Sequence, residues 1–215
     1  MMDKFFRHAV YLNWLEVGLA DSLLSYAEDN QGHFKPSEVL GKDGQFGLSE
    51  RRISLRLRDL GAFAGPLRRQ ALDMVPTLIP RLGLRNFTPD LVELELVAHG
   101  DGAVFAMHWD TVTGRANPKT PRQISMIVYL FRRPRRFIGG QLRYFALGGS
   151  AHIDIEPEHN LLLTFPSIAP HAVQPVSCPG IPFRDWRFAV NMWVHGKAAV
   201  LGRNELNQAA GEKLA

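Results

Sequence analysis

The stretch that decides the fold begins at Leu91 with the run LVELELVA (residues 91–98). From there to residue 195, short apolar runs are separated by glycine and proline, and no helical pattern lies between them. These runs cover residues 91–98, 103–110, 122–130, 141–146, 152–155, 161–165 and 187–195. Short strands at such spacing predict an antiparallel sandwich or barrel. We therefore expect a jelly roll, that is, a double-stranded β-helix.

Two helical stretches precede this series of runs. Residues 19–29 show helical spacing of leucine and alanine, and the apolar residues of 66–82 recur at intervals of three and four. Pro66 suits the first position of the second helix, and Gly83 suits its C-terminal cap. Pro76 lies inside this helix and predicts a kink or a break. We expect both helices to buttress the sheet.

Length and composition indicate how the chain is organised. The 215 residues are 46% hydrophobic and 21% charged, which predicts a single globular domain with an ample core. We divide it into a helical or mixed N-terminal section (1–90), the jelly-roll core (91–196) and a C-terminal tail (197–215). The expected fold class is therefore mainly β with flanking helices.

Signals of export and membrane insertion are not found in the sequence. The first residues lack an apolar stretch of secretory type, and no window reaches the roughly 18 apolar residues of a membrane span. Cys178 is the one cysteine, which excludes an internal disulfide and a zinc cage of thiolates. We expect a cytoplasmic protein in a reducing compartment, with no membrane partner.

The formal charge of +4 and the pI near 9.5 raise the question of an acidic partner. The densest basic run covers residues 132–136, but it has no interleaved aromatic residues and belongs to no nucleic-acid motif. We therefore do not expect nucleic acid as a partner, and we favour a solvated hairpin loop over a docking site for an anionic substrate or carrier. This loop and residues 111–121 are expected to shape the entrance of the site.

His108-Trp109-Asp110 closes the second run and predicts a metal site. Residues two apart in a strand project from the same face, so His108 and Asp110 can present a nitrogen and an oxygen to one point. His171, after a later apolar run, is the candidate third ligand. Two histidines and one carboxylate leave coordination positions open, which suits ferrous iron that must still bind a cosubstrate and oxygen. Trp109 points to the opposite face and is expected to serve packing.

A buried arginine is predicted at the start of the last run. Arg187 and Asn191 fall on one face of that strand. Placing Arg187 inside a barrel costs free energy unless an anion meets it, and its planar guanidinium pairs bidentately with a carboxylate. Tyr129, on another strand, can reach the same carboxylate. A buried arginine near an open iron site implies an acidic cosubstrate.

Five segments, in order, resemble the iron(II)- and 2-oxoglutarate-dependent oxygenases of the prolyl 4-hydroxylase-like superfamily, in their bacterial type. They are HWD at 108–110, RQISMIVYL at 122–130, GGQL at 139–142, PHAVQPV at 170–176 and RFAVNMW at 187–193. Each segment alone is a weak signal, and the five in order are a strong one. The resemblance covers about half of the chain.

This resemblance implies the roles of the site residues. His108, Asp110 and His171 would be the iron ligands and the catalytic centre. Arg187 would pair with the distal carboxylate of 2-oxoglutarate, and Asn191 would lie beside it. The residues implied in cosubstrate binding are Arg187, Tyr129, Leu142, Val173 and Asn191. The implied cofactors are Fe(II), 2-oxoglutarate and O2, with ascorbate as a reductant, and the implied products are succinate, CO2 and a hydroxylated substrate.

Several alternatives stay open at this point. Arg184 competes with Arg187, because the spacing from His171 to Arg187 is longer than in the hypoxia-sensing prolyl hydroxylases. A non-catalytic jelly-roll binding or interaction module is the alternative function, and zinc-dependent hydrolysis is a second enzymatic one. Prolyl peptides, other proteins, amino acids and small metabolites all remain possible substrates, and the oligomeric state is open. The remaining histidines, which are expected to be structural or exposed, are His99, His152, His159 and His195.

Overall fold

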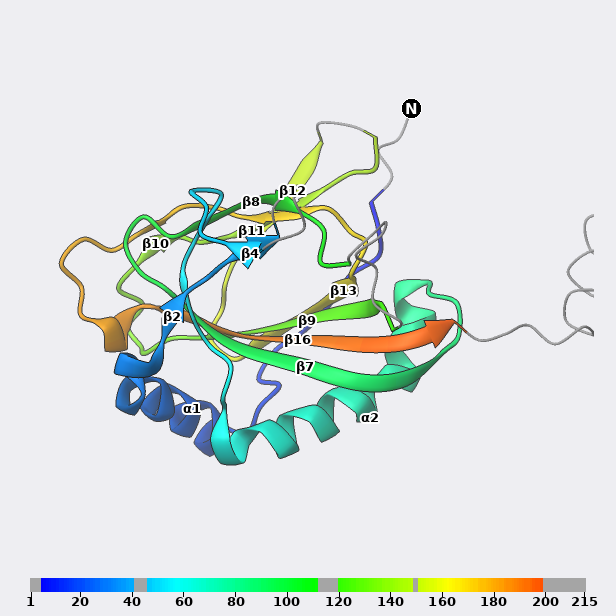
Figure 1. Ribbon diagram of the computed structural model, residues 1–215, viewed down its shortest axis with the longest axis horizontal. Helices are drawn as coiled ribbons and strands as arrows, with labels where there is room; N and C mark the ends of the chain where they lie inside the picture. Colours follow the sequence, from blue (N-terminus) through cyan, green and yellow to red (C-terminus); the bar gives the residue numbers. More distant parts are fainter. Residues whose placement is uncertain (1–4, 41–45, 112–119, 149–150, 199–215) are drawn as a thin grey trace, which may run out of the picture.

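Two β-sheets face each other and enclose the interior of the molecule (Figure 1). The computed structural model describes residues 5–40, 46–111, 120–148 and 151–198. The larger sheet has the strand order β1-β13-β9-β16-β7-β6-β2, and the smaller sheet has the order β12-β11-β14-β8-β5. Neighbouring strands in both sheets are antiparallel. The predicted jelly roll is confirmed.

The strands of the larger sheet, in spatial order, are β1 (Ala9–Tyr11), β13 (Leu161–Pro166), β9 (Arg122–Leu130), β16 (Arg187–Ala198), β7 (Phe87–His99), β6 (Leu55–Leu57) and β2 (Lys35–Pro36). Those of the smaller sheet are β12 (His152–Ile155), β11 (Leu142–Phe145), β14 (His171–Val173), β8 (Val104–His108) and β5 (Arg52–Ile53). Two further pairs are β10 (Ile138–Gly139) with β15 (Val176–Ser177), and β3 (Val39–Leu40) with β4 (Phe46–Gly47). Short 3-10 turns are η1 (Gln31–His33), η2 (Gly61–Phe63) and η4 (Phe183–Asp185).

Two helices cover the outer face of the larger sheet (Figure 1). They are α1 (Val17–Asp29) and α2 (Ala64–Leu82), close to the predicted ranges. Their buried leucines, such as Leu23 and Leu78, form one apolar cluster with strand residues such as Val190. The buttressing role expected of these helices is confirmed.

Helix α2 continues through Pro76, so the break considered for this position is wrong. A proline in a helix removes one backbone hydrogen bond, but packing on the sheet fixes the helix on both sides of it, since Ala71, Val75 and Leu78 are buried. The helix ends as predicted at Gly83, which adopts the left-handed conformation with φ of 68°.

All seven predicted strands are present, and several short ones were missed. β14 has three residues and β5 has two, which is too short for an alternation of apolar and polar residues to be recognised. The N-terminal section also supplies strands, since β1, β2 and β6 join the larger sheet and β5 joins the smaller one. The domain boundaries at residues 90 and 196 stay a prediction.

Strand β16 separates the apolar layer under the helices from a polar interior. Phe188, Val190, Met192 and Val194 belong to the cluster packed against the helices. The alternate residues face the space between the sheets, where they line a cavity of about 760 Å³. This inner face consists of Arg187, Ala189, Asn191, Trp193 and His195. The alternation predicted for this strand is therefore observed, and it carries polar side chains into the barrel.

No helix within the described part of the chain is both long and apolar enough to cross a membrane.

Candidate metal and cosubstrate site

Three predicted ligands converge inside the cavity. His108 ends β8 and His171 begins β14, and the two residues are directly paired across the strands. Asp110 follows two residues after His108, with its carboxylate 3.6 Å from Nε2 of each histidine. One ligand atom from each residue lies within 4.8 Å of the others, which makes these residues a candidate metal-binding group. The structure thus brings together the His-Asp-His set that the sequence predicts.

Hydrogen bonds orient each of these ligands. Nδ1 of His108 lies 2.9 Å from the carbonyl of Ala106, and Nδ1 of His171 lies 2.9 Å from that of Ala169. A proton on each Nδ1 satisfies these carbonyls and leaves the Nε2 lone pairs for a metal. Ser125 donates a hydrogen bond of 2.6 Å from its hydroxyl to Oδ2 of Asp110. Ser125 was not predicted, and it fixes the carboxylate from the opposite sheet.

The ionisation of the site also suits metal binding. Burial by itself would raise the pKa of Asp110, but the neighbouring His171 and His108 outweigh it and hold that pKa well below its usual value. Burial, and then the proximity of His108, lower the pKa of His171 to about 4. At neutral pH the site therefore offers a carboxylate and a neutral imidazole, the forms that bind metal ions. Two nitrogens and one oxygen on one side of an ion form the donor set of non-haem ferrous sites.

Arg187 is buried in the same cavity without an acidic partner. Its residue exposure is 1%, and no carboxylate of the described residues forms an ion pair with it. Its Nη1 donates to Nδ1 of His99 at 2.9 Å, and its guanidinium carbon lies 4.9 Å from the centre of the Tyr129 ring. Two buried polar atoms, Nε of Arg187 and the hydroxyl of Tyr129, have no hydrogen-bond partner among the described residues.

This arrangement has an electrostatic cost. Burial lowers the pKa of Arg187 to about 10, so the side chain remains a cation at neutral pH. Burial raises the pKa of Tyr129 to about 12, so its hydroxyl remains a hydrogen-bond donor. An unpaired buried charge is strongly unfavourable unless a counter-ion binds beside it. The two orphaned donors therefore fit an anionic ligand, and the carboxylate of 2-oxoglutarate meets that requirement.

The other predicted cosubstrate residues differ in their placement. Leu142 and Val173 are paired across β11 and β14, and both line the cavity. Asn191 also lines it, but four residues separate it from Arg187 along β16, about 13 Å in a strand. Its amide donates to Oε1 of Glu95 at 3.3 Å. Asn191 is therefore not beside Arg187, and its role in cosubstrate binding stays a prediction.

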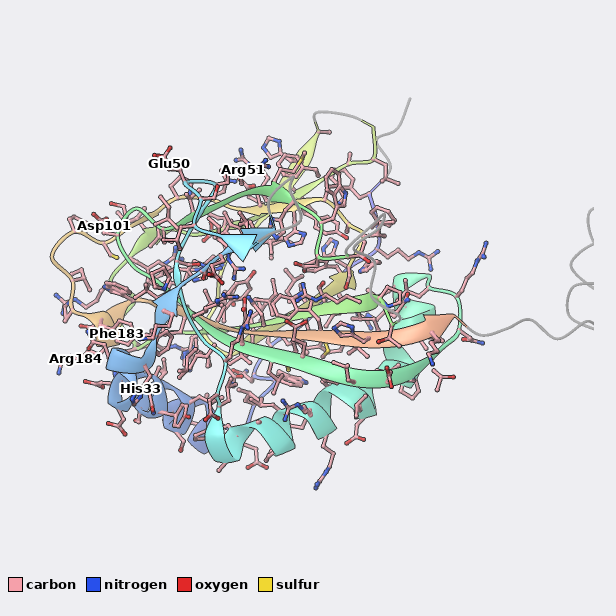
Figure 2. All side chains as sticks on the ribbon, in the orientation of Figure 1. His33, Glu50, Arg51, Asp101, Phe183 and Arg184 are labelled. Atoms are coloured by element: carbon pink, nitrogen blue, oxygen red, sulfur yellow. The ribbon has the colours of Figure 1, made fainter. Side chains whose placement is uncertain are left out.

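The geometry favours Arg187 over Arg184 as the cosubstrate arginine. The side chain of Arg184 is 58% exposed, forms an ion pair of 3.9 Å with Asp185, and is not among the residues that line the cavity. Figure 2 shows it at the outer edge of the molecule, beside the end of α1. The turn predicted around Arg184 is observed as η4.

The structure corrects the expectation for Trp109 and shows where two of the remaining histidines lie. Trp109 was expected to be packed, but it is 54% exposed and lies at the cavity, because β8 ends at His108 and leaves it outside the sheet. His99 is a buried partner of Arg187 and lines the cavity. His195 is buried and contacts Glu93 and the carbonyl of Thr120. Only the pairing of His99 with Arg187 across β7 and β16 identifies it, and this pairing is not visible in the sequence.

The expected entrance at residues 132–136 is also wrong, since none of these residues lines the cavity. Their arginines instead form ion pairs on the protein surface: Arg132 with Glu28, Arg135 with Glu156 and Arg136 with Asp185. Of the second expected entrance segment, residues 112–119 lie outside the described residues.

Comparison with known proteins agrees with this site. The family model of the 2OG-Fe(II) oxygenase superfamily matches residues 94–195, which include the three candidate ligands and Arg187. An uncharacterised PKHD-type hydroxylase of Synechocystis is 27% identical over 193 residues, 86% of this chain. The chain spans 62% of the length of that relative.

Solved structures share the fold at low sequence identity. A prolyl-4-hydroxylase of Pseudomonas putida has a TM-score of 0.65 and 19% identity, covering 89% of this chain and 94% of its own. A prolyl hydroxylase of Trichoplax adhaerens, solved with a peptide fragment of the hypoxia inducible factor, has a TM-score of 0.62 and 20% identity over 88% of this chain and 84% of its own. The fold, the His-Asp-His triad and the family match agree that this chain belongs to the 2OG-Fe(II) oxygenase superfamily.

Proposed function

We propose that this chain is an iron(II)- and 2-oxoglutarate-dependent oxygenase that hydroxylates its substrate. His108, Asp110 and His171 would hold the iron, and Arg187 would bind the distal carboxylate of 2-oxoglutarate. The observation that carries the proposal is the buried, unpaired guanidinium of Arg187 in the same cavity as the triad. A non-catalytic binding module gains nothing from keeping an unneutralised buried cation next to an open set of metal ligands.

The bound metal and cosubstrate would supply the oxidation, in which O2 and 2-oxoglutarate yield succinate, CO2 and a hydroxylated substrate. The protein supplies position and electrostatics. Ser125 holds the Asp110 carboxylate, and the backbone carbonyls of Ala106 and Ala169 hold the two imidazoles. These contacts fix the ligand geometry before the metal binds.

The cosubstrate end of the cavity is built to orient one small acid. Arg187 and the hydroxyl of Tyr129 are donors for its distal carboxylate, and His99 fixes the guanidinium from behind. Leu142 and Val173 give this part of the cavity an apolar lining. Because these groups are ordered and desolvated, their hydrogen bonds to a carboxylate are stronger than the same bonds in water.

The substrate of this oxygenase would be a peptide or a small molecule. The structural neighbours include a viral collagen prolyl hydroxylase and a prolyl hydroxylase in complex with a peptide fragment, and these substrates are those of the neighbouring proteins. For this chain we keep ascorbate as the expected reductant and the cytoplasm as the expected compartment.

Anaerobic titration with Fe(II) and 2-oxoglutarate tests the proposed function. Chelation of the iron by the 2-oxo acid should produce a weak visible charge-transfer band, and His108→Ala should abolish it. His33→Ala is the matched control, because His33 is exposed beside α1 (Figure 2) and should leave the band intact. If the intact protein gave no band, a non-catalytic binding module would explain the site better than an oxygenase.

A further inference from the structure

One strand segment lines the cavity with arginines and has no part in the function described so far. In residues 51–58, RRISLRLR, arginines occupy positions 51, 52, 56 and 58, and apolar residues occupy positions 53, 55 and 57. Leu55 and Leu57 pack toward the helical layer, and Arg52, Arg56 and Arg58 line the cavity. The segment forms β5 and β6, which pair with β8 of the smaller sheet and β7 of the larger one. A row of arginines, at most about 20 Å long if the chain were fully extended, therefore runs along the wall that joins the two sheets.

The first arginine of this row lies close to the metal ligands. The Arg52 guanidinium carbon is 4.8 Å from the centre of the Phe105 ring, and Phe105 stacks on His108 with ring centres 3.5 Å apart. Phe105 and His108 are three residues apart in β8, and the pairing of β8 with β14 shifts register between them. Glu95 accepts a hydrogen bond of 2.6 Å from Nη2 of Arg52. The side chain of Arg52 is only 12% exposed.

The charges of the cavity wall do not balance. Of the residues that the structure describes, six arginines and four carboxylates line it. Three ion pairs, each between one arginine and one glutamate, use up half of the arginines: Arg52 with Glu95, Arg56 with Glu38, and Arg122 with Glu93. Asp110 and Arg187 are reserved for the iron cation and the cosubstrate dianion, whose charges cancel. Arg51 and Arg58 remain without a counter-ion among the described residues.

Arg51 and Arg58 make few interactions with the rest of the protein. Arg51 donates a hydrogen bond of 3.3 Å to the carbonyl of Met107, next to a metal ligand, and it forms no ion pair within the described part of the chain. Figure 2 shows it beside the smaller sheet, on the side away from the helices. Its neighbour Glu50 does not line the cavity. Arg58 is exposed and has no ion pair or hydrogen bond in the same part of the chain.

We infer that the primary substrate is anionic and that its carboxylates bind the arginines of residues 51–58 while the oxidised carbon faces the metal. This inference rests on the proposed function, because it takes the cavity to be an oxygenase site. A cationic substrate is disfavoured, because Glu93 and Glu95 already accept hydrogen bonds from arginines. The length of the row suits an extended acidic peptide better than a single small acid.

The test compares ligands that differ only in charge. The protein is loaded anaerobically with Mn(II) and 2-oxoglutarate and titrated with an N-acetylated hexapeptide of alternating Glu and Ala, and with its Gln counterpart. N-acetylglutamate and N-acetylglutamine form the small-molecule pair. Binding is read from tryptophan fluorescence, because Trp109 and Trp193 line the cavity, and from calorimetry. We expect the Glu peptide to bind at least about tenfold more tightly than the Gln peptide, with a preference that weakens as salt is added.

A double variant assigns this preference to the arginine row. Arg51→Gln with Arg58→Gln should reduce the preference for Glu about threefold for each arginine, and so about tenfold in total, the effect of losing two exposed ion pairs of about 0.7 kcal/mol each. The matched control, Arg69→Gln with Arg133→Gln, removes the same charge from exposed positions outside the cavity and should keep the preference. A preference seen with the peptide alone identifies a peptide substrate, and one seen with N-acetylglutamate identifies a small acid.

Equal binding of Glu and Gln ligands, no binding of either, or an equal loss in the control variant would overturn the inference. The charge-transfer band with Fe(II) and 2-oxoglutarate is recorded on the same preparations. A protein that gives the band without preferring acidic ligands keeps the proposed function and loses the anionic substrate.

Discussion

His99 provides the sharpest test of how the cosubstrate end works. Replacing His99 by Leu removes the acceptor for Nη1 of Arg187, which lies 2.9 Å away. A hydrogen bond to a charged group contributes about 1.5–3 kcal/mol. The hydrogen bond is already present without 2-oxoglutarate, so its removal also destabilises the ligand-free protein. We therefore expect the Kd for 2-oxoglutarate to rise about tenfold, which corresponds to about 1.4 kcal/mol.

The assay titrates the anaerobic Fe(II) protein with two acids and follows the charge-transfer band. 2-oxoglutarate has the distal carboxylate that Arg187 would bind, whereas pyruvate has the same 2-oxo acid end without it. His99→Leu should weaken the first and change the second little. If both acids lost affinity equally, the variant would have damaged the metal site instead, and unchanged affinity for 2-oxoglutarate would refute the positioning role of His99.

The same substitution should change how stability depends on pH. Burial, followed by the charges of Arg187 and Arg52, holds the pKa of His99 well below 6.5 in the folded protein. Below about pH 6.5 the unfolded chain binds a proton at His99 that the folded protein does not, so the free energy of unfolding falls as the pH falls. Denaturant unfolding of His99→Leu should therefore show a shallower loss of stability from pH 6.5 downward, and a slope identical to that of the unmodified protein would contradict a neutral buried imidazole.

Three further substitutions test the site. Gly140→Ala places a methyl group 2.7 Å from Cδ of Arg187 and should weaken 2-oxoglutarate binding in calorimetry, whereas Gly148→Ala, at a similar φ but with open space, should not. Ser125→Ala removes a 2.6 Å hydrogen bond to Asp110 and should weaken metal binding by about 10- to 100-fold in a chelator competition, with intact metal affinity as the contrary result. Arg187→Leu removes an unpaired buried cation, so it should abolish cosubstrate binding without lowering the thermal midpoint of the cosubstrate-free protein, and a clear drop in that midpoint would count against the argument.

The parts of the site that were predictable from the sequence are local or periodic. His108 and Asp110 are two apart at the end of a strand, and strand geometry alone places them on one face. Arg187 and Tyr129 also lie on the faces of long strands that alternation predicts. His171 was recognised from its flanking segment, although its strand is too short to be read from periodicity.

The missed parts depend on register between distant segments. His99 meets Arg187 because β7 and β16 pair at that level, and Ser125 meets Asp110 across the two sheets. The arginines of residues 51–58 are visible in the sequence, but only the pairing of β5 and β6 with different sheets shows that they line the cavity. Trp109 was assigned to the wrong environment, because the strand ends before it.

Both ends of the cavity depend on charges that the protein alone leaves unneutralised. The inner end holds Arg187 in a place where burial is costly, and a protein under selection for stability alone would replace it by an apolar residue. The outer wall differs, because Arg51 and Arg58 are exposed and their charge costs little to keep. A deep cation suits a small ligand that must be held in one orientation, whereas shallow cations suit a ligand that is attracted along an open wall. This difference in burial is why we assign the buried Arg187 to the cosubstrate and the exposed Arg51 and Arg58 to the substrate.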